Sequence, residues 1–174
     1  MSATDNARRL ADLMTFNDDL IMVSLTDMND DVARRRLRDG GPSVTWELGH
    51  MLYHRNEIAA AIGCRAPAVD VKPFNEAATD GRGYPTVPEL RQAWQEFSAR
   101  LVAAVNGLSA QQLEAPSPMQ LPYGEQTLLD AMRFVVWHEG LHLGQIALLR
   151  SHHGLTPLVT LVRERAAAAH ALLS

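Results

Sequence analysis

Apolar residues recur at helical spacing through residues 124–153, and polar residues interrupt this pattern at its centre. Steps of four and three residues along this segment select Ala131, Val135, His138, His142, Gln145 and Leu149. Four residues advance a helix by about 400°, so the imidazoles of His138 and His142 leave the same face. Burying these rings without partners would cost roughly 1–3 kcal/mol each. The spacing alone is compatible with one metal ion held by both rings and with an ordinary hydrogen-bonded pair.

The same periodicity covers nearly the whole chain and predicts an all-α fold, because no strand-like alternation of useful length occurs. Four long helices are expected at residues 5–26, 44–62, 86–107 and 124–153. The segment 63–85, which contains three prolines, is expected to form a long crossover between the second and third helices. Residues 158–173 are expected to add a C-terminal helical extension. These elements predict a four-helix bundle in a single domain that spans residues 1–174.

The composition excludes several classes of protein. The 174 residues carry a formal net charge of -4 and lack the basic excess that nucleic-acid binding requires. The amino-terminal segment has no long apolar run, which argues against a signal peptide or a membrane anchor. The single cysteine, Cys64, excludes an intramolecular disulfide and a cysteine-rich zinc site. Together these features predict a cytoplasmic protein with no nucleic-acid or membrane partner.

A third histidine in a comparable setting lies upstream, in the segment WELGHMLYH of the second expected helix. There Trp46, His50 and Tyr53 share a face, so that His50 could complete a site with the histidine pair. His54 lies one turn beyond His50 and is either a further ligand or, as we favour, a solvent-facing side chain. The aromatic residues Trp46, Tyr53 and Trp137 are expected to pack in the core.

A second pattern competes with the three-histidine site. Both helices contain Glu-x-x-His, at residues 47–50 and 139–142. Two such motifs with one more glutamate from each remaining helix describe a di-iron carboxylate bundle. The first expected helix holds no glutamate, so that Asp18 or Asp19 would have to substitute, with Glu96 on the third helix. This alternative leaves His138 without a role and is less favoured.

The segment HEGLHLGQ, together with ELGHMLYHR farther upstream, resembles the DinB-like (DinB/YfiT) superfamily of metal-dependent enzymes. The number of helices, the long connection between the second and third helices and the order of the histidines agree with that family. The resemblance implies a DinB-like four-helix bundle with a metal site at His50, His138 and His142. It also implies that Gln145 is a structural or outer hydrogen-bonding group near the site, and that the chain pairs as a homodimer.

Three neutral imidazoles leave an open position on a metal ion, as catalytic sites do, and a water or thiol bound there has a lowered pKa. The resemblance implies thiol chemistry, because understood members include transferases and isomerases that use low-molecular-weight thiols. We therefore expect a metal-dependent transferase or hydrolase that acts on a small molecule. Zinc, nickel, iron or manganese would be its metal, and a low-molecular-weight thiol is a candidate cosubstrate.

The alternative from another class is a non-catalytic stress or binding protein whose metal ion only stabilises the bundle. Such a structural site would be coordinatively closed, with His54 or Glu47 as the fourth ligand. The sequence singles out no catalytic residue. Glu47 and Glu139 are expected to be hydrogen-bond partners or surface charges rather than catalytic groups.

Overall fold

The computed structural model describes residues 2–37, 40–78 and 82–171, which form seven α-helices, one 3-10 helix and no β-strand. The predicted all-α fold is therefore confirmed. In chain order the elements are α1 (Ala3–Ser24), α2 (Asp30–Ala33), α3 (Val44–Ala61), η1 (Lys72–Asn75), α4 (Val87–Asn106), α5 (Ala110–Leu113), α6 (Leu128–His152) and α7 (Leu158–Ala171). Among the described helices, none combines the length and apolar character needed to cross a membrane.

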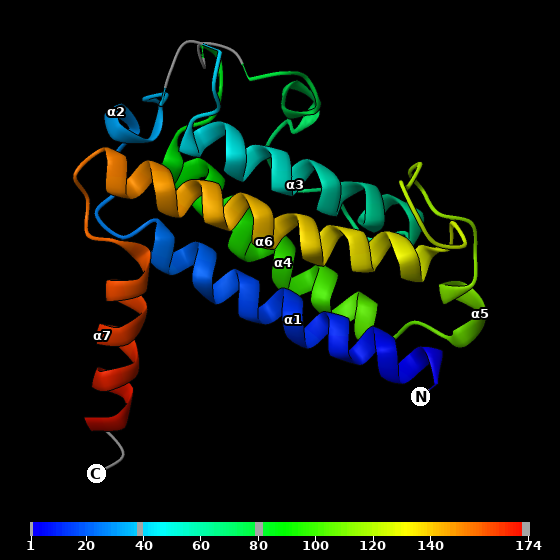
Figure 1. Ribbon diagram of the computed structural model, residues 1–174. Helices are drawn as coiled ribbons and strands as arrows, with labels where there is room; N and C mark the ends of the chain where they lie inside the picture. Colours follow the sequence, from blue (N-terminus) through cyan, green and yellow to red (C-terminus); the bar gives the residue numbers. More distant parts are fainter. Residues whose placement is uncertain (1, 38–39, 79–81, 172–174) are drawn as a thin grey trace.

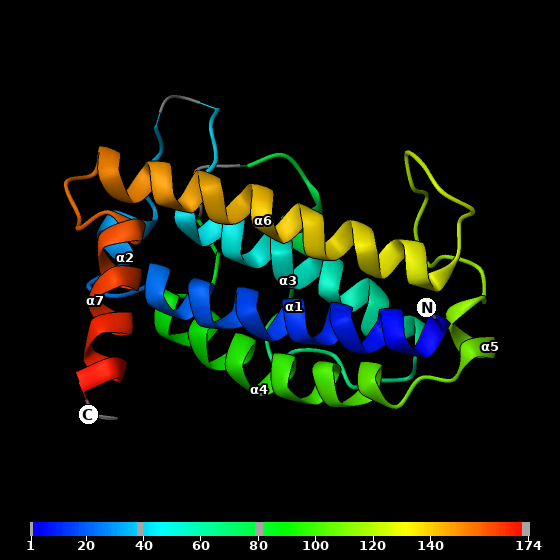
Figure 2. The same cartoon turned by 60° about the horizontal axis from the view of Figure 1, so that its bottom comes forward.

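The helices α1, α3, α4 and α6 form a four-helix bundle (Figure 1). In this bundle α1 lies between α4 and α6, and α3 contacts the same two helices from the other side. Figure 2 shows that α1 and α6 point in one direction along the bundle, whereas α3 and α4 point in the other. Between α3 and α4 the chain forms η1, which lies against α3. The last helix, α7, projects from one end of the bundle and contacts α1 and α6.

Local hydrogen bonds explain why α3 and α4 begin where the sequence predicts. The hydroxyl oxygen of Ser43 accepts the backbone N–H of Trp46, which caps α3. The side chains of Thr86 and Glu89 form a reciprocal capping box at the start of α4. Gly63 then follows α3 with φ of 70°, a left-handed conformation that stops a helix.

The helix α6 begins at Leu128, later than the start expected near residue 124. Thr127 and Asp130 form a capping box, and Asp130 also accepts the backbone N–H of Glu125 at 2.9 Å. Gln126 has φ of 61°, which is incompatible with a right-handed helix. The expectation was wrong at this end because the apolar periodicity does not reveal a left-handed residue before the cap.

The buried guanidinium of Arg150 joins the ends of α1, α6 and α7. It donates to the carbonyl oxygens of Ser24 at 2.7 Å and Thr26 at 2.8 Å, and to that of Thr156 at 2.9 and 3.2 Å. Helix C-terminal carbonyls lack partners within their own helix, and α1 has no basic residue in its last turn. Arg150 therefore supplies from α6 the cap that α1 lacks. The expected end of the C-terminal helix at residue 173 lies outside the described residues.

A buried ion-pair network connects the four bundle helices. Arg55 of α3 is fully buried and binds both carboxylate oxygens of Glu139 on α6. Its Nη1 also donates to Asp18 Oδ1 on α1 at 2.7 Å and to Ser98 Oγ on α4 at 2.6 Å. Its Nη2 donates in addition to the carbonyl oxygen of Met14 at 3.3 Å. All five guanidinium N–H groups therefore have acceptors.

Candidate metal centre

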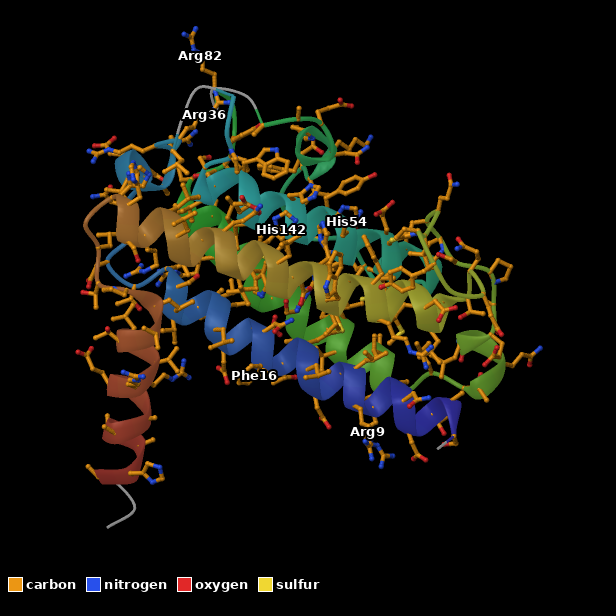
Figure 3. The ribbon with its side chains drawn as sticks, viewed as in Figure 1. Arg9, Phe16, Arg36, His54, Arg82 and His142 are labelled. Carbon is orange, nitrogen blue, oxygen red and sulfur yellow. The ribbon has the colours of Figure 1, made fainter. Side chains whose placement is uncertain are left out.

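Two histidines of α6 and one of α3 converge where these helices meet. The candidate ligand atoms of His50, His138 and His142 all lie within 4.8 Å of one another. His138 and His142 are buried, whereas His50 is partly exposed. Figure 3 shows His142 at the junction of α3 and α6. The fold thus brings together the three residues implied by the resemblance, in a group that could hold a metal ion.

Hydrogen bonds outside this group determine which nitrogen is protonated in two of the rings. His50 Nδ1 donates to the backbone oxygen of Phe74, 2.7 Å away. His142 Nδ1 donates to the carboxylate of Glu47. Because these oxygens only accept, each neutral ring carries its proton on Nδ1 and its lone pair on Nε2. Outer contacts of this kind orient metal-binding histidines and raise their basicity.

Glu47 is itself held in place inside the protein. It is fully buried, and burial raises its pKa, although the hydrogen bond from His142 opposes the shift. With the amide of Gln145 oriented to satisfy its neighbours, its nitrogen lies 2.9 Å from each carboxylate oxygen of Glu47. Glu47 is thus a hydrogen-bond partner of the histidine group, and Gln145 is an outer group that fixes Glu47.

His138 has the least complete set of partners. Its Nε2 faces His142 Nε2 at 2.9 Å, and its buried Nδ1 has no hydrogen-bond partner among the described residues. The pKa of His138 is lowered to about 3 and that of His50 to about 4. Burial is the largest cause of both shifts, and the neighbouring histidines contribute to them. Both rings are therefore neutral at pH 7. Neutral imidazole nitrogens that converge in a buried site fit a divalent ion such as zinc, nickel, iron or manganese.

Gly49 allows η1 to approach α3 and so positions the carbonyl group that binds His50. A Cβ atom at residue 49 would lie 2.4 Å from the ring of Phe74, which is fully buried. We expect Gly49→Ala to displace Phe74 and to lower stability by about 1–3 kcal/mol, as overpacking does. Thermal melting measures this loss, and a metal titration should show weaker binding through the freed ring of His50.

Gly140→Ala is the matched control for this prediction. A Cβ atom at residue 140 of α6 would meet nothing within 4 Å. Alanine stabilises an exposed helix interior by about 1 kcal/mol relative to glycine, so this variant should melt at the same or a higher temperature. Equal melting temperatures for the two variants would contradict the steric role of Gly49.

Replacing Glu47 by glutamine should weaken metal binding without unfolding the protein. The substitution keeps the shape of the side chain but removes the charge that His142 faces. Loss of an outer hydrogen-bond partner lowers metal affinity by about 10–100-fold. Competition with a chelator of known affinity measures the change. Glu96→Gln on the exposed surface of α4 is the control, and an unchanged affinity in Glu47→Gln would refute the prediction.

His54 lies beside the histidine group and is partly exposed to solvent, so that it is more covered than the solvent-facing side chain we favoured. Its ring centroid is 4.7 Å from that of His50 and 4.6 Å from that of His138, and 18% of its side chain is exposed. Its Nδ1 lies 2.8 Å from a carboxylate oxygen of Glu57. Spacing along α3 shows which residues share a face, but not that α6 covers this one. His54 is not among the three residues whose ligand atoms converge.

Aromatic rings stack on two of the histidines. The ring centroids of Trp46 and His50 are 4.4 Å apart with an interplanar angle of 14°, and those of Phe134 and His138 are 5.4 Å apart with an angle of 27°. Sequence analysis missed Phe134, although its position one turn before His138 was the available signal. Trp137 is 57% exposed and not part of the core as expected, because it points to a different face of α6 from its neighbour His138.

The carboxylates that the di-iron alternative requires do not gather at the histidines. Glu139 and Asp18 both bind Arg55 in the core network. Glu96 is exposed on α4. Of the two Glu-x-x-His motifs, only the one with Glu47 contributes its glutamate to the site. The other glutamate is neither a surface charge nor a partner of the histidines, contrary to what we expected of it.

Residues 16–146 match the family described as the DinB superfamily. This range covers most of the chain and includes the three histidines and Gln145, so the chain belongs to the DinB superfamily. A comparison with curated proteins gives no match. The family and the three-histidine group are both compatible with a metal-binding protein.

Proposed function

We propose that this protein is a metal-dependent enzyme in which His50, His138 and His142 hold one divalent ion that binds a small thiol or water for transfer or hydrolysis. The observation that carries this proposal is the convergence of three imidazoles within 4.8 Å in a largely buried setting. Three protein ligands leave a coordination position for an exogenous group. Zinc, nickel, iron and manganese all bind imidazole nitrogen and are the candidate ions.

The residues around the site have defined tasks in this proposal. A bound ion would supply a lowered pKa for a thiol or water at the open position. Glu47 holds His142 and the carbonyl of Phe74 holds His50, so that both Nε2 lone pairs stay directed into the site. The partial exposure of His50 provides a route from solvent. We place this activity in the cytoplasm, where the free thiol of Cys64 stays reduced.

Cobalt(II), a spectroscopic substitute for the native ion, tests the proposal. The protein should bind one cobalt ion per chain after chelation and reloading. Addition of 2-mercaptoethanol should then change the visible spectrum, because sulfur enters the open coordination position. A spectrum that thiols leave unchanged would favour the non-catalytic, metal-stabilised alternative. His138→Ala should bind cobalt much more weakly, and two ions per chain would contradict the single three-histidine site.

We also propose that the chain forms a homodimer through α1 and α6. Leu13 and Phe16 of α1 are 47% and 58% exposed, and Leu141 and Leu148 of α6 are 48% and 57% exposed. These two helices are neighbours in the bundle. Large apolar side chains exposed on neighbouring helices are candidates for a protein interface.

Charges along α1 support a second copy of the chain as the partner. Figure 3 shows Arg9 and Phe16 pointing away from the bundle on α1. A two-fold axis between Leu13 and Phe16 would set α1 antiparallel to its copy and bring Arg9 of each chain toward Asp19 of the other. The contact of Asp19 with Arg165 of the same chain, at 3.2 Å, is exposed to solvent and leaves Asp19 accessible.

Charges introduced into this apolar surface should separate the dimer. We expect the double variant Leu141→Glu/Leu148→Glu to be monomeric by sedimentation or light scattering, because each interface would bury four carboxylates without partners. Ala103→Glu, at an exposed position of α4, should leave the dimer intact. A wild-type chain that is monomeric at micromolar concentration would overturn the proposal.

A further inference from the structure

We propose, building on the metal-dependent function above, that this site selects a flat, apolar and uncharged thiol over an anionic one, with Phe134 and Glu57 as specificity-determining residues. Phe134 and Glu57 are partly exposed and lie on the side of the site that faces solvent. His50 and His54 are partly exposed on this side, whereas the two histidines of α6 are buried. A small molecule therefore reaches the histidine group past side chains of α3 and of the first half of α6.

Aromatic rings line this approach on both helices. Trp46 of α3 stacks on His50, and Phe134 of α6 stacks on His138. Both aromatic side chains are partly exposed, and the exposed ring of Trp137 lies 5.7 Å from that of Phe134. A flat ligand gains stacking contacts with such rings, which a branched or strongly hydrated thiol does not.

The carboxylates of Glu57 and Glu76 make the solvent-facing side of the site negatively charged. Glu57 is 24% exposed and accepts a hydrogen bond from His54 at 2.8 Å. Burial raises the pKa of the Tyr53 hydroxyl. The charge and the hydrogen bond of Glu57 also raise this pKa, and so does the charge of Glu76. Glu76 lies on the same side of the site, because its backbone oxygen accepts the indole N–H of Trp46 at 3.2 Å. The arginine that follows His54 does not neutralise these carboxylates, because Arg55 is fully buried in the core network.

This distribution of charge opposes thiols that carry a carboxylate. Such a ligand brings its negative charge toward Glu57 and Glu76, and like charges closer than a Debye length repel one another. An uncharged thiol of the same shape has the stacking contacts without the repulsion.

Two aromatic thiols of matched shape test the role of charge. 4-Mercaptobenzamide and 4-mercaptobenzoate differ by one negative charge, and their binding to the cobalt(II)-loaded protein is followed in the visible spectrum without turnover. We expect the amide to bind about tenfold more tightly at low ionic strength, and the difference to shrink in salt. Glu57→Gln should bring the ratio of the two affinities closer to one while it leaves binding of the amide unchanged.

Phe134→Ala tests the role of the aromatic ring. This variant should bind both aromatic thiols about tenfold more weakly, because the stacking contacts are lost. The ratio of amide to carboxylate affinity should stay as in the wild type, because the ring carries no charge, and each affinity is measured on fully cobalt-loaded protein. Phe16→Ala is the control, because Phe16 is an exposed aromatic residue on α1, away from the histidine group.

The outcomes distinguish this inference from the function on which it rests. Equal or tighter binding of 4-mercaptobenzoate would overturn the inference, as would wild-type affinity of both aromatic thiols for Phe134→Ala. In either case binding of cobalt and 2-mercaptoethanol would still support the metal-dependent function. Failure of the wild-type protein to bind cobalt would instead overturn the proposed function and the inference together.

Discussion

Replacing Arg55 by methionine is expected to lower the free energy of unfolding by about 3–5 kcal/mol, the usual cost of removing one partner of a buried ion pair. The guanidinium is fully buried and binds Glu139, which is also fully buried. Methionine fills much of the same volume but leaves the carboxylate of Glu139 without a counter-charge. Urea denaturation measures the loss as a lower midpoint at an unchanged m-value.

Two further variants identify the cause of that loss. Arg55→Met combined with Glu139→Gln removes the two fully buried charges, and it should recover most of the lost stability. The remaining amide can still bind Asn17, and Asp18 keeps the hydrogen bond from Trp94. Arg133→Met removes an exposed partner of Asp130 and should cost less than about 1 kcal/mol. If Arg55→Met lost no more stability than Arg133→Met, the network would not hold the bundle together.

Binding of one zinc ion is expected to raise the melting temperature of the metal-free protein, and His142→Ala should abolish this effect. A ligand that binds only the folded state stabilises it by about 2.7 kcal/mol at a free concentration of 100 times Kd. His142 contributes a converging nitrogen and connects the site to Glu47. Its loss should therefore weaken zinc binding by more than the roughly 10–100-fold expected for an outer partner.

Calorimetry with and without zinc, followed by chelation, measures this effect. The shift should disappear on chelation and return on reloading. His152→Ala is the matched control, because His152 is an exposed histidine near the end of the same helix. The prediction fails if His142→Ala retains the wild-type shift, or if chelation leaves the melting temperature of the zinc-loaded wild type unchanged.

Helix positions were largely predictable from the sequence because they depend on contacts between residues close in the chain. Capping by Ser43 and Thr86 acts over three residues, and it sets the first turns of α3 and α4. His138 and His142 share a face for the same local reason. The start of α6 was misplaced because the left-handed conformation of Gln126 leaves no apolar pattern.

The two Glu-x-x-His motifs show what local pattern cannot decide. They have the same spacing, yet Glu47 binds His142 on the opposite helix, while Glu139 binds Arg55 in the core. The direction in which each glutamate points into the bundle follows from the rotation of its helix against its neighbours. That rotation is set by packing between segments far apart in the chain.

The sequence by itself determined the all-α fold, the positions of the long helices and the shared face of the histidine pair in α6. It also contained the motif resemblance that singled out His50. Only the tertiary structure placed His54 and Phe134 beside the histidine group and made the carbonyl of Phe74 the partner of His50. The physical reason is that periodicity and capping act within a few residues, whereas these contacts require segments from different helices and loops to meet.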